Sequence, residues 1–219
     1  MAYVNFYTLL ICSLGLVIGS CQSGTEPVKT EILQDSISKV VKKEPTIPIS
    51  DGFDYPVSNE TKVTARRDGD GWYNAQDFKK NNHLGEDWNA ESGGNTDCGK
   101  PVYAASKGLV VYSGDAGYGW GKVTIIRHIL PDSSLIETLY GHLEEQLTKR
   151  GDVIERREQL GTVGDGAEPC GDGSPYYAHL HFEVRIKDCP AWGESGGGYS
   201  AEFEGWVDPS EFIDKHRNL

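Results

Sequence analysis

Apolar and polar positions alternate most regularly near the C-terminal end of the chain, between residues 176 and 187. Every second position there is apolar, namely Ala178, Leu180, Phe182, Val184 and Ile186. The positions between them are polar or aromatic and include His179 and His181. Because successive side chains of a strand point to opposite faces, this pattern predicts a strand with one face in the core. Its polar face carries both histidines side by side.

Shorter runs rich in β-branched and aromatic residues precede this strand. They cover residues 102–105, 109–113, 122–128, 135–140 and 160–163, and Gly, Asp, Asn or Pro separates them. Glycine makes up 27 of the 219 residues, well above its usual share of about 7%, which indicates many tight turns. Short strands with frequent turns predict an all-β fold, a small antiparallel barrel or sandwich.

The first twenty residues contain no charged residue and no histidine, as in an export signal or a membrane span. They end in Ile18-Gly19-Ser20-Cys21, which resembles the lipobox of bacterial lipoproteins. The resemblance implies cleavage before Cys21, acylation of Cys21 and attachment to a bacterial membrane. Gln22 favours the outer membrane and its periplasmic face. An uncleaved single-span anchor, or an ordinary signal with a chance cysteine, are the alternatives.

Residues 21–55 are rich in Ser, Thr, Pro, Lys and Glu, which predicts a flexible tether between the lipidated cysteine and a folded domain over residues 56–219. The formal net charge of −12 argues against nucleic acid as a partner, because counterion release needs clustered Lys and Arg.

The domain holds Cys98, Cys170 and Cys189, so an exported chain is expected to form one disulfide and leave one thiol. Cys170 and Cys189 flank one strand in Gly-rich loops, which favours their pairing. An extended strand separates its ends too far for a bridge, however, so the pairing stays open.

Two histidines at i and i+2 on one strand are a common element of metal sites, and a third ligand must come from elsewhere. His83 and Asp87, four residues apart, are the candidates. The Asn and Gly residues around them argue against a helix, so the chain has to bend between the two, and Gly85 is where it can. Two imidazoles and a carboxylate leave one position of a four-coordinate ion for water, as in catalytic zinc sites.

Three segments resemble, in the same order, the motifs of the lysostaphin-type (LytM-like) zinc metallopeptidases, which cut peptidoglycan cross-links. They are His83-Leu84-Gly85-Glu86-Asp87, Tyr140-Gly141-His142-Leu143 and His179-Leu180-His181-Phe182-Glu183. The resemblance implies that His83, Asp87 and His181 hold Zn²⁺. It also implies that His142 and His179 flank the bound water as catalytic residues, either of which could be the base. The family's fold is a small antiparallel β-barrel related to the lipoyl and biotinyl hammerheads, the duplicated hybrid motif.

The chain departs from the family pattern at three places. Arg157 stands in a hairpin where the family usually has Gly, so that turn must differ or carry strain. Tyr73 is the nearest match to a tyrosine that some members have before the first motif, and it is left unassigned. The loops 88–99 and 188–205 are longer than a minimal barrel needs, and we expect them to shape the substrate groove. Glu183 is expected to support a ligand rather than to be one.

These observations favour a membrane-tethered zinc endopeptidase that hydrolyses peptide cross-links of peptidoglycan. The alternative is a non-catalytic lipoprotein that binds the cell wall and activates other hydrolases. Degenerate members of the family lose ligands, whereas all five positions are filled here. A substrate-binding lipoprotein would leave the motif order unexplained. The bond that is cut, the oligomeric state and any regulatory partner stay open.

Overall fold

The computed structural model describes residues 45–58, 71–117, 119–167, 169–171, 174 and 176–219, all within the unit formed by residues 44–219. The predicted signal at 1–20, the lipidation site Cys21 and most of the predicted tether lie outside the described residues. Within the described ranges, no helix is both long and apolar enough to cross a membrane.

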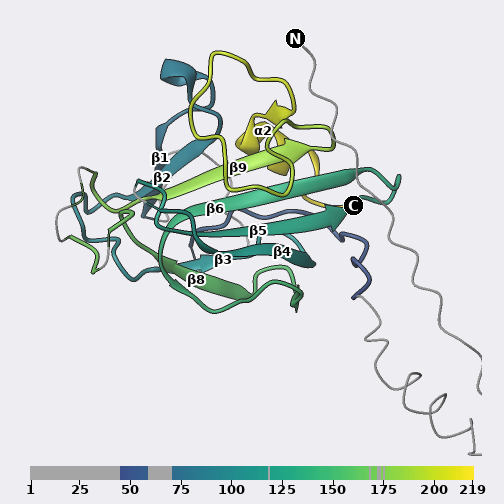
Figure 1. Cartoon of the computed structure of the whole chain (residues 1–219), viewed down its shortest axis with the longest axis horizontal. Helices are drawn as coiled ribbons and strands as arrows, with labels where there is room; N and C mark the ends of the chain where they lie inside the picture. The colour runs from purple at the N-terminus through teal and green to yellow at the C-terminus, as the bar shows by residue number, and fades with distance from the viewer. Residues whose placement is uncertain (1–44, 59–70, 118, 168, 172–173, 175) are drawn as a thin grey trace, which may run out of the picture. The chain divides into compact units, whose positions relative to one another are not determined.

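The described strands form one antiparallel sheet (Figure 1). Their bounds are β1 (Trp72–Gln76), β2 (Glu86–Ala90), β3 (Pro101–Tyr103), β4 (Gly108–Asp115), β5 (Lys122–Ile129), β6 (Leu135–Gln146), β7 (Val153–Ile154), β8 (Gln159–Val163), β9 (Leu180–Ile186) and β10 (Trp206–Val207). The main path runs β1-β2-β9-β6-β5-β4-β7, while β8 pairs with β6 and β3, and β10 pairs with β9. A short 3₁₀ helix η1 (Lys80–Asn82) precedes β2, and the helix α2 (Pro209–Lys215) follows β10.

The all-β, antiparallel prediction is confirmed, but the sheet is open rather than a closed barrel. The reason lies in β6, which changes partner along its length. Residues 136–141 of β6 pair with β9, and residues 143–146 pair with β8. The sheet therefore branches at β6, and β1 and β7 are the two ends of its main path in the part of the chain that the structure describes.

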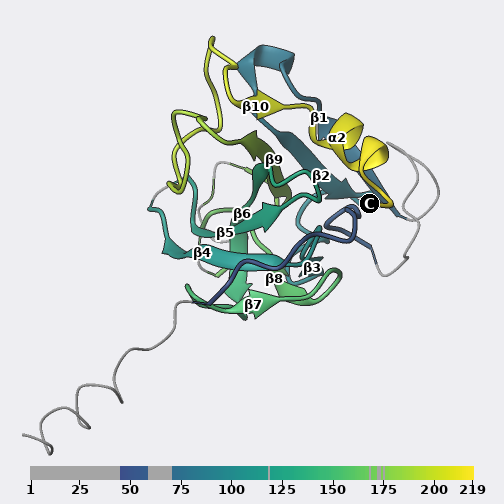
Figure 2. The ribbon, with the colours of Figure 1, turned by 90° about the vertical axis from the view of Figure 1, so that its right-hand side faces the viewer.

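Strand β9 has the predicted alternation, with Leu180, Phe182 and Val184 fully buried in the core. The opposite face is polar, as the alternation predicted, but it is buried rather than open to solvent. Glu183 and Arg185 on that face are also fully buried. The loop of residues 187–205 covers them, and together with β10 and α2 it lies beside β2 and β9 (Figure 2).

Residues 50–57 belong to the packed unit, although the sequence assigned residues up to 55 to the tether. Phe53, Tyr55 and Val57 are buried in the main core. The backbone N–H of Asp54 donates to Ala105 O at 2.8 Å, and Asp54 Oδ2 accepts from Arg156 Nε at 2.7 Å. Apolar side chains at every second position, each with a place in the core, explain why this segment is ordered.

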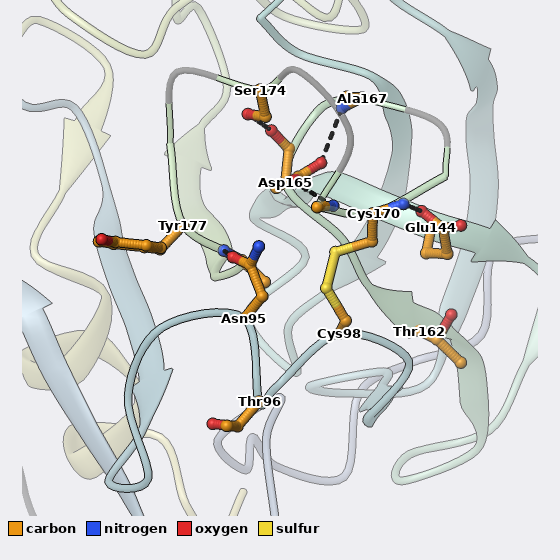
Figure 3. Close-up of a disulfide and its surroundings, with 12 residues drawn as sticks. Asn95, Thr96, Cys98, Glu144, Thr162, Asp165, Ala167, Cys170, Ser174 and Tyr177 are labelled. Carbon is orange, nitrogen blue, oxygen red and sulfur yellow. Dashed lines mark hydrogen bonds between the residues drawn. A yellow bond between two sulfur atoms is a disulfide. The ribbon is translucent and has the colours of Figure 1, made fainter.

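The disulfide joins Cys98 to Cys170, so the pairing of Cys170 with Cys189 that the sequence favoured is wrong. Strand β9 separates Cys170 from Cys189 in extended form, which is the geometric obstacle that the sequence had indicated. The bridge ties the loop after β2 to the loop before β9 (Figure 3). Cys189 is a buried free thiol, 3% exposed.

His128 on β5 is a buried structural histidine away from the motifs. One ring nitrogen, Nδ1, donates to Lys107 O at 2.9 Å, and Nε2 lies 2.8 Å from Thr138 Oγ1. Burial outweighs the bond to Lys107 and lowers the pKa of His128 to about 4. The ring is therefore neutral at pH 7.

Candidate metal centre

His83, Asp87 and His181 meet where β2 pairs with β9. Asp87 and His181 are opposite each other in the register of these strands, and His83 precedes β2. Asp87 Oδ1 lies 3.2 Å from His83 Nε2 and 3.0 Å from His181 Nδ1, and the two nitrogens are 3.0 Å apart. All three residues are buried.

The geometry of these three donor atoms fits a zinc ion. Zinc binds imidazole nitrogen and carboxylate oxygen at about 2.0–2.2 Å in tetrahedral sites, so its ligand atoms stand about 3.3 Å apart. The three donors are within a few tenths of an ångström of that spacing. Two imidazoles and one carboxylate are also a donor set that zinc commonly takes. Despite burial, Asp87 and Glu183 raise the pKa of His181 to about 9, so zinc would displace the proton from its Nδ1.

The chain bends at Leu84 and Gly85, between His83 and Asp87, as the sequence predicted, and it also turns sharply just upstream of the motif. Lys79, Asn81 and Asn82 have φ of 66°, 53° and 65°, in the left-handed region, and His83 then returns to extended backbone. Gly85 is not among the residues with positive φ. A Cβ at Gly85 would lie 2.4 Å from Phe182 O, so glycine is needed there because β2 approaches β9 closely.

Glu183 forms a hydrogen bond with the ring nitrogen of His181 that faces away from the other two donor residues. His181 Nε2 donates to Glu183 Oε1 at 2.9 Å, which leaves Nδ1 directed at Asp87 and His83. Burial raises the pKa of Glu183, but Arg185 and His181 outweigh burial and lower it to about 2. Glu183 is therefore an ionised acceptor that fixes the orientation of His181.

His142 and His179 lie next to the donor cluster, with ring centroids 4.6 Å apart. His142 Nδ1 lies 3.2 Å from Trp120 O, and His179 Nδ1 lies 2.7 Å from Tyr177 O. A carbonyl oxygen only accepts, so each Nδ1 carries a proton, and in the neutral form of either ring Nε2 keeps its lone pair. His179 Nε2 is 3.7 Å from Asp87 Oδ1.

His142 has an unusual backbone for a non-glycine residue, with φ of 59°. It stands on β6 between the residues that pair with β9 and those that pair with β8. Such conformations cost roughly 1–3 kcal/mol and are concentrated at functional sites. Burial, and then the nearby His179 and His181, lower the pKa of His142 well below its ordinary value, so its ring is neutral at pH 7.

The cluster opens into a cleft of about 520 Å³. Its aromatic lining comes from Trp120, Tyr176 and Tyr199. Gly198 lies against Trp120, whose ring would be only 3.0 Å from a Cβ at that position. None of the described lining residues is Lys or Arg, so the charge of the cleft comes from Asp87, the histidines and any bound cation.

One of the two long loops lines the cleft as expected, and the other does not. The loop 188–205 contributes Gly197, Gly198 and Tyr199. The loop 88–99 contributes no described lining residue; instead, Cys98 ties it to the segment that leads to Tyr176.

Tyr199 was not singled out by the sequence, although its side chain lines the cleft. Its ring lies 5.0 Å from that of His83, and its hydroxyl accepts from Gln76 Nε2 at 3.0 Å. Tyr73, the nearest sequence match to the tyrosine of other family members, is not among the lining residues. A contact between residues 76 and 199 has no local sequence signal, because the loop brings them together.

Residues 81–191, about half of the chain, match the family described as Peptidase family M23. The chain belongs to this family, and the resemblance indicated by the three motifs is confirmed. The catalytic domain of the antimicrobial peptidase lysostaphin from Staphylococcus simulans is similar over 60% of this chain and 79% of its own, with 25% identity and a TM-score of 0.42.

Three relatives differ in what their names say they do. The lipoprotein NlpD/LppB homolog of Pseudomonas aeruginosa is 33% identical over 42% of this chain and 27% of its own length. The peptidoglycan DD-endopeptidase ShyB of Vibrio cholerae is 30% identical over 43% and 20%. The murein hydrolase activator NlpD of Escherichia coli is 31% identical over 47% and 26%. The matches therefore span between a fifth and about a quarter of these relatives' lengths.

Proposed function

We propose that the protein is a zinc-dependent endopeptidase that hydrolyses peptide cross-links of bacterial peptidoglycan. The observation that carries the proposal is the convergence of five motif residues on one cleft. Three of them place donor atoms within about 3 Å of one another, and the other two hold their imidazole rings beside them through Nδ1. Membership of a peptidase family supports the reaction class.

His83, Asp87 and His181 would hold the zinc ion, through Nε2, Oδ1 and Nδ1 respectively. A zinc ion bound there would lower the pKa of a bound water to about 7 and would polarise the scissile carbonyl. Asp87 is ionised, because its hydrogen bonds with His181 and His83 outweigh burial and keep its pKa far below the ordinary value. Glu183 fixes the ring of His181 so that Nδ1 stays on the donor side.

His142 and His179 are suited to the two proton transfers that amide hydrolysis requires. Each ring is fixed by a bond from Nδ1 to a backbone carbonyl, so that Nε2 is available to accept a proton. The lowered pKa of His142 means that it is unprotonated before reaction. One histidine would accept a proton from the attacking water, and the other would stabilise the developing oxyanion or protonate the leaving amine.

The substrate and the location follow from the relatives and from the N-terminal segment. ShyB is named a peptidoglycan DD-endopeptidase, and others are named lipoproteins. We infer a cell-envelope protein whose acylated Cys21 attaches it to a membrane, the outer membrane at its periplasmic face. The tether would then let the cleft reach peptidoglycan peptides.

The second candidate is a non-catalytic activator of other wall hydrolases, because the similar Escherichia coli protein is named a murein hydrolase activator. The complete set of five residues favours the enzyme, since an activator does not need two histidines oriented through Nδ1 beside a metal site.

The test is to incubate the purified protein with peptidoglycan sacculi and to identify released muropeptides by mass. The enzyme predicts cleaved cross-links that disappear when a chelator removes the metal and return when zinc is restored. The activator predicts no release by the protein alone, with or without zinc.

A further inference from the structure

A row of charged side chains lies beneath the loop of residues 187–205, and apart from Glu183 it has no part in the proposed chemistry. Glu137 on β6 is opposite Arg185 on β9 and Arg127 on β5 in the sheet register. Glu137, Arg185 and Glu183 are fully buried. Buried charges are costly unless hydrogen bonds and ion pairs satisfy them, so their partners show what the row holds in place.

Arg185 has partners on both sides of its guanidinium. Its Nε and one terminal nitrogen lie 2.8 and 2.7 Å from Glu183 Oε2. The terminal N–H groups also donate to three backbone carbonyls of the loop, at Ala191 (2.9 Å), Glu194 (2.6 Å) and Gly196. One side chain therefore joins a carboxylate of the sheet to three points of the loop.

Glu183 continues this connection to the metal centre. Its Oε2 accepts from Arg185 and from Trp206 Nε1, the latter at 2.8 Å. Its Oε1 accepts from His181 Nε2 at 2.9 Å and from the backbone N–H of Gly198 at 2.8 Å. The same oxygen atom thus contacts a metal-binding candidate and the loop that forms a wall of the cleft.

The part of the loop held in this way is the part that lines the cleft. Gly198 and Tyr199 are lining residues, and Gly198 O accepts from the backbone N–H of Leu84, next to His83. At a separate anchor, the N–H of Gly193 donates to Glu137 Oε2 at 2.8 Å. The wall is therefore attached to the sheet at several points, and the Arg185–Glu183 pair connects it to His181 through hydrogen bonds.

We propose that Arg185 is a positioning residue that sets two parts of the site at once. Through the three carbonyls it fixes residues 191–196, which lead into the cleft wall at 197–199, and through Glu183 it fixes the ring of His181. The inference rests on the proposed function for the role of the cleft as substrate site and of His181 as zinc ligand.

The fork shape of the guanidinium is essential to this role. Lysine keeps the positive charge next to Glu183, but its single ammonium cannot satisfy a carboxylate and three separated carbonyls together. Arg185→Lys therefore tests the geometry without leaving Glu183 as an unpaired buried charge. Arg185→Gln is a second variant that keeps hydrogen-bonding capacity without charge. Arg127→Lys is the matched control, because Arg127 bonds Glu137 but not Glu183.

Three measurements separate positioning from a general loss of stability. Hydrogen exchange should become at least about tenfold faster for amides 191–199 in Arg185→Lys, while amides of β5 and β6 keep their protection. Zinc should bind about 10- to 100-fold more weakly, the usual cost of removing an outer support of a ligand. At saturating zinc, KM for a cross-linked muropeptide should rise by roughly tenfold, with a smaller fall in kcat. Arg127→Lys should keep wild-type zinc affinity.

The proposal is overturned if Arg185→Lys and Arg185→Gln keep wild-type exchange at 191–199 together with wild-type zinc affinity. It is also overturned if all amides lose protection to the same degree in both variants, because the effect is then on the whole fold. Exchange and zinc binding need no substrate. If the wild type cleaves no muropeptide but the Arg185 variants show both effects, the proposed function is wrong and the positioning role stands.

Discussion

Removal of the Cys98–Cys170 disulfide should destabilise the domain by several kcal/mol. The bridge closes a loop with a sequence separation of 72 residues. The chain-entropy relation gives about 4.4 kcal/mol for a loop of that length at 25 °C, and measured values commonly fall at 2–4 kcal/mol. We expect about 3–4 kcal/mol for Cys98→Ala/Cys170→Ala. At 2–4 °C per kcal/mol for a domain of this size, the melting temperature should fall by about 10 °C.

The double variant should still fold, because other bonds hold the same two loops together. Asn95 Oδ1 accepts from the N–H of Ala178 at 2.9 Å, and Asn89 Nδ2 donates to Ala178 O at 3.0 Å. The Asp165 carboxylate accepts from the N–H groups of Ala167 and Gly171 (Figure 3). These contacts hold the segment before β9 without the disulfide, so we expect the variant to be less stable but still folded.

Urea unfolding of the wild type and the double variant, each with and without reductant, measures the effect. Reductant should lower the stability of the wild type and leave the double variant unchanged. Cys189→Ala is the control and should keep the full response to reductant, because Cys189 is a free thiol. A difference below about 1 kcal/mol would refute the loop-closure reasoning. Loss of the reductant response in Cys189→Ala would refute the pairing.

Three further predictions concern other parts of the chain. Arg157→Gly relieves a left-handed backbone (φ 67°) but removes the hydrogen bonds from the Arg157 side chain to Tyr55 O and Ser58 O. Thermal unfolding should therefore show a net decrease of about 2 kcal/mol in the unfolding free energy, and an increase would contradict this account. The pKa of His128 is about 4 in the folded state and about 6.5 in the unfolded state, so the unfolding free energy should rise by about 3 kcal/mol between pH 4 and pH 6.5. This dependence on pH should be weaker in His128→Asn. An equal dependence in the variant would assign it to other groups. Cys21→Ser should leave the protein unacylated, as measured by fatty-acid labelling, and continued labelling would remove the lipobox interpretation.

The local pattern of the sequence predicted the elements that depend on side-chain alternation. Strand β9 forms where Leu180, Phe182 and Val184 alternate with polar residues, because alternation alone decides which side chains enter the core. The order of the three motifs also predicted which side chains would gather, since β2, β6 and β9 are neighbours in the sheet.

Features that depend on long-range packing could not be predicted in the same way. The polar face of β9 is buried because the loop 187–205 folds over Glu183 and Arg185, which no periodicity within the strand indicates. The partner of Cys170 is set by where the loop after β2 lies in three dimensions. The segment containing Phe53 and Tyr55 looked like a tether because Pro, Asp and Gly surround its apolar residues.

The most direct test of the central claim measures zinc content and muropeptide release on the same four variants. His181→Ala and Asp87→Ala should lose both zinc and release, because a ligand is removed. His142→Ala and His179→Ala should keep about one zinc while release falls by at least the 10²- to 10⁴-fold typical of removing a general acid or base. Loss of zinc in His179→Ala with retention in Asp87→Ala would contradict the ligand set, and near-wild-type release by His142→Ala would contradict its part in catalysis.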